Sequence, residues 1–248
     1  ESRGTHLNVN FPRYRDYNVG VISNKTAAVL LAVVAAVALT AQTVQARRLH
    51  RLQTVVIDPG HGGRDFGAKS MNLVLEKDVT RKLARSIKET IEKQNGKRVK
   101  VVITHSGISE ADQADRAFAA AKAKGDVYIS LHAASGFDQS SRDLGIYIWV
   151  KEKSAPSSWK NANAKHRASS LVLAEKLRKN LGGFYRHKKF FVRSSRLLTL
   201  YGIDMPAAVI EVIALNDPKD EIKLNANNYY KKLSALFYSA LVDYDKNL

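Results

Sequence analysis

The sequence predicts a single α/β domain, built on a mixed, mostly parallel sheet of about six strands that is flanked by helices. From Thr54 onward, short apolar runs rich in Val and Ile alternate with longer stretches whose apolar residues recur at helical spacing. Runs of the first kind are typical of strands buried on both faces, and the alternation is typical of largely parallel sheets. Neither an internal repeat nor a second domain boundary interrupts the pattern.

Five segments carry the strand pattern, and they are residues 54–58 (TVVID), 99–104 (VKVVIT), 126–132 (DVYISLH), 145–150 (GIYIWV) and 207–212 (AAVIEV). The helical pattern covers residues 75–94, 110–124, 165–181 and 225–244. Gly96 and Gly125 stand where the first two helices should end, because glycine readily adopts the left-handed backbone common at helix ends. Residues 151–165 form the one long polar connection, which we expect on the surface.

Residues 1–46 are expected to be a leader, and residues 47–248 the working domain. Ala27–Leu39 consists of thirteen consecutive apolar residues, and the polar segment after it ends in the small residue Ala46. With basic residues before it, this order is typical of a secretory signal peptide cleaved after Ala46. The alternatives are an uncleaved N-terminal anchor, although a bilayer span needs about 20 apolar residues, and a buried core helix. Under the first two interpretations, the domain works outside the cytoplasm.

The chain is strongly basic and has no cysteine. Its 40 Lys and Arg residues outnumber its 23 Asp and Glu residues and give a net charge of +17, most of which lies after residue 46. Such an excess favours nucleic acid, acidic lipid head groups or acidic polymers of the cell envelope as partners, although it also serves solubility alone. Without cysteine, a metal site must use His and carboxylate ligands.

Four polar side chains lie where the carboxyl ends of the predicted strands meet. His61 follows the first strand across a Pro-Gly turn, His132 ends the third strand, and Glu211 lies late in the last. Glu76 stands near the start of the first helix, after a glycine-rich stretch. Because ligands of open α/β sheets bind at this edge, we expect these four side chains to lie close together.

The four side chains suit the chemistry of a catalytic zinc site. Two His and one carboxylate are a common ligand set for catalytic zinc, which keeps a further position for water. His61, Glu76 and His132 supply such a set, and Glu211 supplies a base that moves a proton to a leaving amine. Each ligand also has a plain structural interpretation, as a loop residue, a favourable charge at a helix start or a hydrogen-bonded strand end. Glu211 is harder to explain this way, because a carboxylate in an apolar run is costly to bury unpaired.

Three blocks of sequence, in order, carry a longer pattern. They are Val56–Ala68 (VIDPGHGGRDFGA) with Leu75–Asp78 (LEKD), Arg116 and Asp126 with Ile129–Ala133 (ISLHA), and Met205–Glu211 (MPAAVIE) with Asn216–Glu221 (NDPKDE). Together they resemble the zinc-dependent N-acetylmuramoyl-L-alanine amidases of the type 3 family, and the resemblance runs from about Thr54 to Tyr244.

The resemblance implies a mixed α/β fold with one Zn²⁺ bound by His61, Glu76 and His132, and with Glu211 as the catalytic carboxylate. The reaction it implies is hydrolysis of the amide that joins N-acetylmuramic acid to L-Ala of the peptidoglycan stem peptide. Three further positions are expected to contact the substrate or to support the ligands, and they are Asp65, Arg116 and Ala134.

Some segments depart from the family pattern. Ala134 stands where the family usually has Asn, Thr104–Ile108 (THSGI) replaces a Thr-Arg-x-x-Asp element, and Val212–Leu215 replaces a Gly-Phe pair. These departures concern contacts to the substrate and leave the ligands intact. We expect His105, within the altered segment, to be a structural residue near the site rather than a fourth ligand.

Taken together, the sequence predicts an exported hydrolase of the periplasm or cell wall that acts on peptidoglycan. Its basic surface would attract anionic envelope polymers, and we expect no nucleic-acid partner, because no recognition motif is present. Contact with a membrane is expected only if the N-terminal segment stays uncleaved. Two alternatives stay open, which are a catalytically impaired envelope-binding protein of the same fold and a metallo-amidase with another substrate.

Overall fold

The computed structural model describes Val29, Val33 and residues 48–133, 143–150, 162–185, 188–226 and 228–248. It divides into residues 1–46 and a compact unit, Arg47–Leu248. Apart from its two valines, the predicted leader lies outside the described residues, and so does Ala134. Within the part of the chain that is described, no helix is long and apolar enough to span a bilayer.

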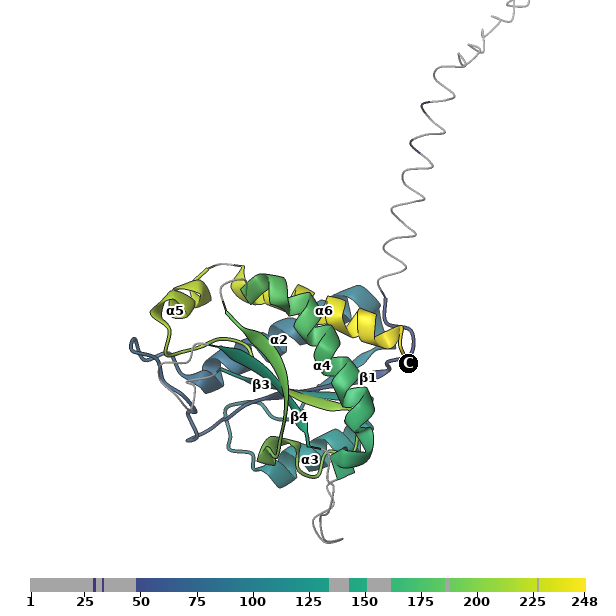
Figure 1. Ribbon diagram of the computed structural model, residues 1–248, viewed down its shortest axis with the longest axis horizontal. Helices are drawn as coiled ribbons and strands as arrows, with labels where there is room; N and C mark the ends of the chain where they lie inside the picture. Colours follow the sequence, from purple (N-terminus) through teal and green to yellow (C-terminus); the bar gives the residue numbers. More distant parts are fainter. Residues whose placement is uncertain are drawn as a thin grey trace, which may run out of the picture. The chain divides into compact units, whose positions relative to one another are not determined.

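The domain contains one six-stranded sheet, in the order β2-β1-β3-β6-β4-β5 (Figure 1). All neighbouring strands run parallel except β4 and β6, which are antiparallel. The predicted fold class is therefore confirmed. The strands are β1 (Thr54–Pro59), β2 (Lys100–Ile103), β3 (Val127–His132), β4 (Leu144–Trp149), β5 (Phe190–Ser195) and β6 (Ala207–Glu211).

Helix α3 differs from the expected pattern in its start and in its cap. Helix α3 begins at Gln113 rather than residue 110, because Asp112 and Asp115 form a capping box there. It ends on Lys124, whose own backbone is left-handed (φ 53°), so Gly125 is not the cap that its sequence position suggests. Gly96 does cap the preceding helix, with φ of 61°.

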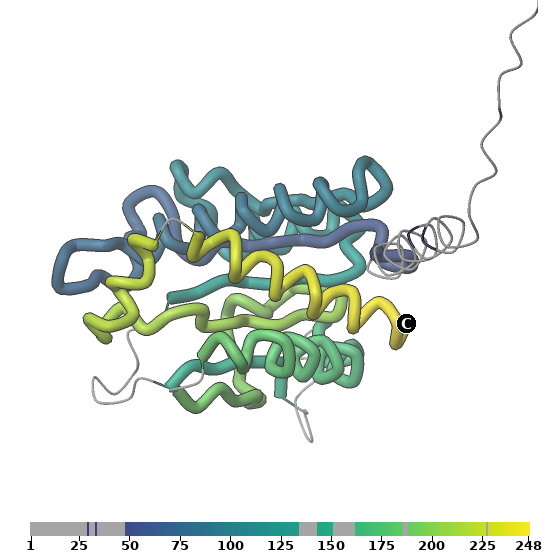
Figure 2. Tube along the Cα trace, turned by 90° about the horizontal axis from the view of Figure 1, so that it is seen from above, coloured from purple at the N-terminus to yellow at the C-terminus, as the bar shows by residue number. Residues whose placement is uncertain are grey.

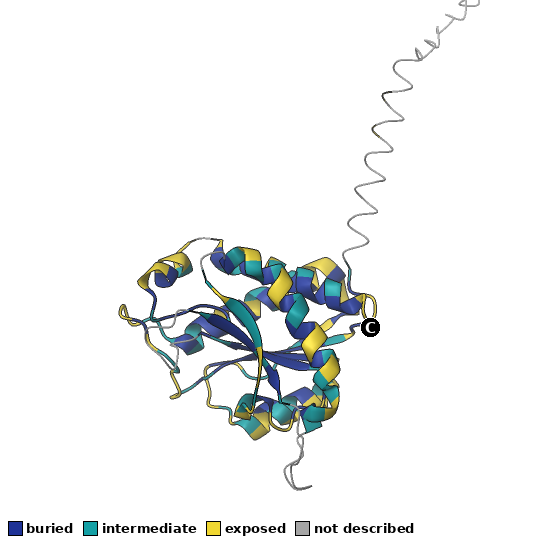
Figure 3. Ribbon diagram, viewed as in Figure 1, coloured by how far each residue is buried: buried dark blue, intermediate teal, exposed yellow. Residues whose placement is uncertain are grey.

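The helices cover both faces of the sheet. Figure 2 shows α6 running between α2 and α4 on one face, where the larger hydrophobic cluster lies, and α3 packs with a smaller cluster on the other face (Figure 1). The central strands β1, β3, β6 and β4 between them are almost fully buried (Figure 3). The helices are α2 (Glu76–Asn95), α3 (Gln113–Ala123), α4 (Arg167–Gly182), α5 (Pro218–Leu224) and α6 (Tyr229–Asp245).

Strand register sets the position of the candidate site. Because β1, β3 and β6 are parallel neighbours, their carboxyl ends share one edge of the sheet, where His132 pairs in register with Glu211. The turn after β1 lies beside the end of β3, since the backbone N–H of Gly60 donates to the carbonyl of Leu131 at 2.8 Å. Helix α2 then begins at Glu76, close to the same edge.

Candidate metal centre

The turn after β1 directs His61 toward the carboxyl edge of the sheet. Gly60 has no room for a side chain, since a Cβ there would lie 2.7 Å from both the His132 ring and the Leu131 carbonyl oxygen. Its own carbonyl accepts a 2.9 Å hydrogen bond from Thr80 Oγ1 of α2. His61 has a left-handed backbone (φ 63°), which is disfavoured for residues with a Cβ and persists only where the surroundings enforce it.

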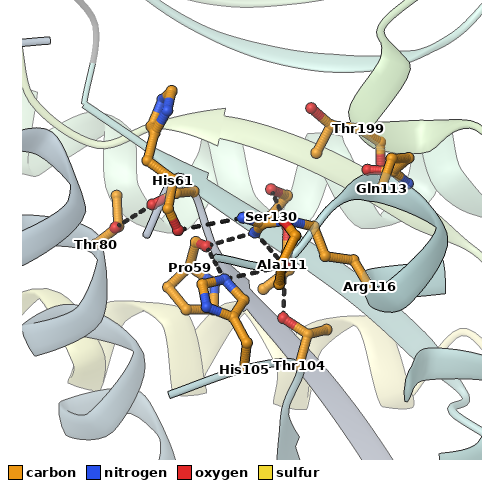
Figure 4. A network of polar contacts seen from close by, with 12 residues as sticks. Pro59, His61, Thr80, Thr104, His105, Ala111, Gln113, Arg116, Ser130 and Thr199 are labelled. Atoms are coloured by element: carbon orange, nitrogen blue, oxygen red, sulfur yellow. Dashed lines mark hydrogen bonds and ion pairs between the residues drawn. The ribbon is translucent and has the colours of Figure 1, made fainter. Parts of the chain in front are cut away.

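A buried arginine supports the same turn from α3 (Figure 4). Arg116 Nη1 donates to Asp58 Oδ1 at 2.9 Å and to the Pro59 carbonyl at 2.7 Å, and Nη2 donates to the His61 carbonyl at 3.2 Å. Two hydroxyl groups also donate to the Asp58 carboxylate, and they are Thr104 Oγ1 at 2.5 Å and Ser130 Oγ at 2.8 Å. Arg116, predicted to contact substrate or support the ligands, therefore holds the backbone on which His61 sits.

Three side chains converge on one point at this edge. His61 Nε2 lies 3.2 Å from Glu76 Oε2, and His132 Nδ1 lies 3.0 Å from Glu76 Oε1. One ligand atom from each residue lies within 4.8 Å of the others, as three groups around one metal ion require. Backbone N–H groups of Ala68 and Ala133 each donate to one Glu76 oxygen at 2.8 Å, and so they fix the orientation of the carboxylate.

Asp65 orients the first of the two imidazoles. Its Oδ2 lies 2.8 Å from His61 Nδ1, and its Oδ1 accepts from the Gly67 N–H at 3.1 Å. A carboxylate can only accept here, so Nδ1 carries the proton and Nε2 faces Glu76. Carboxylates that orient a ligating histidine in this way are a recurring feature of metal sites.

The charges within the cluster are strongly coupled. Burial opposes a charged imidazole on His61, but hydrogen bonds and charge from Glu76 and Asp65 outweigh it and raise the pKa of His61 to about 9. In the same way, the pKa of His132 is raised by Glu76 despite burial. Burial works against the charge of Glu76, yet hydrogen bonds from both imidazoles hold its pKa well below the ordinary value. The cluster thus keeps one carboxylate charged between two imidazoles that bind protons tightly.

Glu211 lies on β6, directly beside His132 in the parallel register. Its Oε2 atom is buried and, among the described residues, has no hydrogen-bond partner. Burial is the main reason that the pKa of Glu211 rises to about 7, and the charge of Glu76 raises it further while His132 opposes the shift. A buried carboxylate oxygen without a partner is costly in a folded chain, so this atom is a candidate to contact a bound group.

A cavity of about 330 Å³ opens next to the two imidazoles. His61 and His132 line one side, and the start of α3 and the segment Leu198–Thr199 line the other. Gln113 joins the start of α3 to the Leu198–Thr199 segment, because its Nε2 donates to the Thr199 carbonyl at 3.0 Å. The cavity provides room for a substrate beside the ligand cluster.

The structure brings five of the seven predicted site residues into one cluster, places Arg116 beneath it, and does not describe Ala134. His105 lies outside the cluster, as its Nε2 contacts the Pro59 carbonyl at 2.7 Å and its Nδ1 accepts from the Gly107 N–H at 3.0 Å. Sequence reasoning missed Thr80 and Ser130, whose hydroxyl groups support the site. No sequence pattern marked either residue, because Ser and Thr are common in helices and strands without supporting a site.

The fold and the site define a class of α/β protein with a candidate His-Glu-His metal centre at the carboxyl edge of a mixed sheet. A sequence model of the family described as N-acetylmuramoyl-L-alanine amidase matches residues 55–243. The chain belongs to this family.

Individual relatives agree with this assignment. The chain is 24% identical over 223 residues to a probable N-acetylmuramoyl-L-alanine amidase, AmiB, of Haemophilus influenzae, which covers 76% of this chain and 51% of that protein. It is 29% identical over 175 residues to a probable cell wall amidase, LytH, of Staphylococcus epidermidis, with 70% and 52% of the two chains covered. The chain thus spans about half the length of these curated relatives.

Solved structures of similar fold include the catalytic domain of CwlV, an N-acetylmuramoyl-L-alanine amidase from Bacillus (Paenibacillus) polymyxa. It superposes with a TM-score of 0.65 at 25% identity and covers 78% of this chain and 98% of that one. An N-acetylmuramoyl-L-alanine amidase from Clostridium difficile superposes with a TM-score of 0.66 at 23% identity, covering 79% and 97%, and it supports the fold alone.

Proposed function

We propose that this protein is a zinc-dependent peptidoglycan amidase, which hydrolyses the amide between N-acetylmuramic acid and L-Ala of the stem peptide. The single observation that carries the proposal is the convergence of His61, Glu76 and His132 on one point, with Glu211 as the neighbour of His132. Membership of the amidase family supports the choice of substrate. The physical chemistry of the site supports metal-assisted hydrolysis but does not by itself select one amide.

The donor set fits Zn²⁺. Two imidazole nitrogens and one carboxylate oxygen, without cysteine, are the ligands of many catalytic zinc sites. The supports fit as well, because the Glu76 oxygens accept two backbone N–H groups and Asp65 orients His61. A zinc ion bound there would supply a Lewis acid that activates water and polarises the carbonyl of the substrate.

The proposed role of Glu211 is proton transfer. Its buried carboxylate takes one proton from the attacking water as the new carbon–oxygen bond forms. It then gives that proton to the amide nitrogen as the carbon–nitrogen bond breaks, so that the peptide leaves with a free amine. A pKa of about 7 suits both steps near neutral pH, because proton transfer is most effective when donor and acceptor strength are matched to the working pH.

Digestion of purified peptidoglycan tests the proposal directly. We expect the protein to release intact stem peptides that begin with a free L-Ala amine, as measured by mass spectrometry of the soluble products. A chelator should abolish the release, and added Zn²⁺ should restore it. Cleavage that resists the chelator, or products cut within the sugar strand, would contradict the proposed function.

The same experiment separates the two alternatives. An envelope-binding protein that has lost catalysis would bind the sacculus without releasing peptide. A metallo-amidase with another substrate would leave peptidoglycan intact and yet hydrolyse other acylated amines in a chelator-sensitive way. The intact set of three candidate ligands and the buried Glu211 oxygen favour the first proposal over an envelope-binding protein without catalysis. Membership of the amidase family favours it over a metallo-amidase with another substrate.

We expect the positive charge of the chain to strengthen binding to the envelope, with the protein exported to the periplasm or cell wall. Attraction between a basic surface and anionic envelope polymers is screened by salt, since the Debye length shortens to about 8 Å at physiological ionic strength. Cosedimentation of the protein with sacculi should therefore weaken steadily as the salt concentration rises. Binding that does not change with salt would contradict this role of the charge.

Replacing Asp65 with alanine is expected to weaken Zn²⁺ binding about 10–100-fold, because His61 loses the carboxylate that fixes its ring and proton. Competition with a chromophoric chelator measures the dissociation constant. Asp204→Ala is the matched control, since it also removes an exposed carboxylate, one that contacts Lys165 and His166 instead of a candidate ligand. Equal affinities for the two variants would show that Asp65 has no supporting role.

The affinity for Zn²⁺ is expected to rise with pH until about pH 9, the pKa of His61. Below that value the imidazole carries a proton that must leave before the ion binds, so each pH unit lost should weaken binding by at least about tenfold. Isothermal titration with Zn²⁺ near neutral pH, in two buffers of different ionisation enthalpy, counts the released protons. We expect at least about one proton per ion, and no release would contradict the protonated state of His61.

A further inference from the structure

An aromatic and basic surface lies beyond Glu211, on the side of the sheet away from β1. Strand β4 pairs antiparallel with β6, with Ile146 beside Ile210, so one further step in this register brings Gly145 beside Glu211. Gly145 in turn pairs with Phe191 of β5. His132, Glu211, Gly145 and Phe191 thus lie side by side on four neighbouring strands, in one row across the sheet.

Two aromatic rings occupy the space over Gly145. A Cβ at this position would lie 2.7 Å from Phe191 Cε2 and 2.8 Å from Tyr147 Cε2, so only glycine fits beneath the rings. The rings of Tyr147 and Phe191 meet edge to face, with centroids 6.0 Å apart. Both side chains are only partly buried. They form an apolar wall next to the catalytic carboxylate.

Arg193 adds a positive charge to this wall. Its guanidinium carbon lies 4.2 Å from the centre of the Phe191 ring, and its Cα pairs with Tyr147 across the strands. The side chain is exposed, and within the described ranges it makes no ion pair with a carboxylate. Both Glu211 and Arg193 lie close enough to affect the charge of Tyr147. Burial is the main cause that raises the pKa of Tyr147, the charge of Glu211 raises it further, and the charge of Arg193 lowers it.

The leaving peptide is the part of the substrate that faces this wall in the proposed mechanism. Glu211 gives its proton to the leaving amine, so the amine and the peptide attached to it lie on the Glu211 side of the ligand cluster. The cavity beside the two imidazoles is lined in part by the acidic residues Asp65 and Asp112, which would repel an acidic peptide. The charge of Arg193 suits such a peptide instead.

The distance between Glu211 and Arg193 determines which residue of the peptide the arginine can contact. Neighbouring strands lie about 4.8 Å apart and residues rise about 3.3 Å along a strand, so Arg193 stands about 12 Å from Glu211, measured between Cα atoms. An extended peptide advances about 3.5 Å per residue, and the long arginine side chain spans much of the remainder. A carboxylate on the second residue after the scissile amide lies within this reach.

We propose that Tyr147, Phe191 and Arg193 form a subsite for the stem peptide, in which Arg193 binds the carboxylate of the second peptide residue. The two rings pack against the alkyl parts of the same segment. This inference rests on the proposed function and deepens it, because it assigns the peptide side of the site and the charge that the enzyme prefers there.

Two soluble preparations of peptidoglycan strands, uniform except at the second stem residue, test the subsite. One carries a free α-carboxylate at that residue, and the other a carboxamide. The zinc-loaded protein is expected to cleave the carboxylate form with a kcat/KM about two- to fivefold higher, the range of an exposed charge pair. In Arg193→Ala this preference should fall to about one, and Arg193→Lys should keep part of it.

The controls separate binding from structure. Arg178→Ala removes an equally charged side chain from α4, on the other face of the sheet, and should keep the full preference. The melting temperature and Zn²⁺ affinity of Arg193→Ala should match those of the unaltered protein. A preference that survives in Arg193→Ala, or one that is absent from the unaltered protein, overturns the subsite. Cleavage of neither preparation by the unaltered protein overturns the proposed function together with the subsite.

Discussion

Glu211→Gln is expected to lower kcat for amide hydrolysis about 10²–10⁴-fold while Zn²⁺ binding persists. Glutamine has nearly the shape of glutamate but cannot accept the proton of the attacking water or return it to the leaving amine. The buried Oε2 atom, which has no partner among the described residues, is the atom we expect to do this work. Release of stem peptides under saturating substrate measures kcat, and chelator competition measures the metal affinity.

Glu175→Gln provides the matched control for this prediction. Glu175 is an exposed glutamate of α4 that pairs with Arg178. Its replacement makes the same chemical change without touching the ligand cluster, so kcat should stay within a factor of about two. Equal activity of the Glu211→Gln protein and the unaltered protein would rule out the proposed proton transfer.

Arg116→Met is expected to destabilise the domain by about 3–5 kcal/mol, because it leaves the buried Asp58 carboxylate without its cation. The change also removes hydrogen bonds to the carbonyls of Pro59 and His61. We therefore expect weaker Zn²⁺ binding as well as lower stability, since the turn that carries His61 loses its support. Urea unfolding measures the loss of free energy at constant m-value.

The surface substitution Arg178→Met is the control, because the exposed pair with Glu175 should contribute at most about 1 kcal/mol. A loss in Arg116→Met no larger than in this control would mean that Asp58 finds other partners. Such a result would also remove the structural reason for the arginine at this position.

The sequence predicted the central strands and the ligand cluster because both follow from local patterns. β1, β3 and β6 are buried on both faces, so their Val and Ile runs stand out in the chain. Parallel pairing then places the residues at their carboxyl ends on one edge, which brings His61, His132 and Glu211 together without knowledge of the loops.

The missed elements lie at the margins of the fold. β5 is an edge strand whose residues are only partly buried or exposed, and its second half, Arg193–Ser195, is polar. It therefore lacks the apolar run that marks a central strand. α5 has only seven residues and is held by tertiary contacts, since its buried Glu221 accepts hydrogen bonds from Ser70 and Asn72. Periodicity cannot detect a helix of two turns.

The contacts that hold the turn of His61 in place could not be predicted from the sequence either. Arg116 and Asp58 lie 58 positions apart, and nothing in either neighbourhood shows that they meet. The role of Asp65 was easier to anticipate, because it stands four residues from His61 in the same glycine-rich turn. Contacts that depend on helix α3 docking against the sheet required the structure.

Under the proposed function and subsite, the reversal of strand direction at β4 separates hydrolysis from peptide binding along the chain. The candidate ligands and Glu211 come from β1, β3, β6 and the start of α2, whereas the wall of Tyr147, Phe191 and Arg193 comes from the continuous unit β4-α4-β5. Substitutions within that unit change no residue of the ligand cluster. On this proposal, a designer who wishes to redirect the protein toward another peptide would vary residues 144–195 as one segment and leave the proposed hydrolytic centre unchanged.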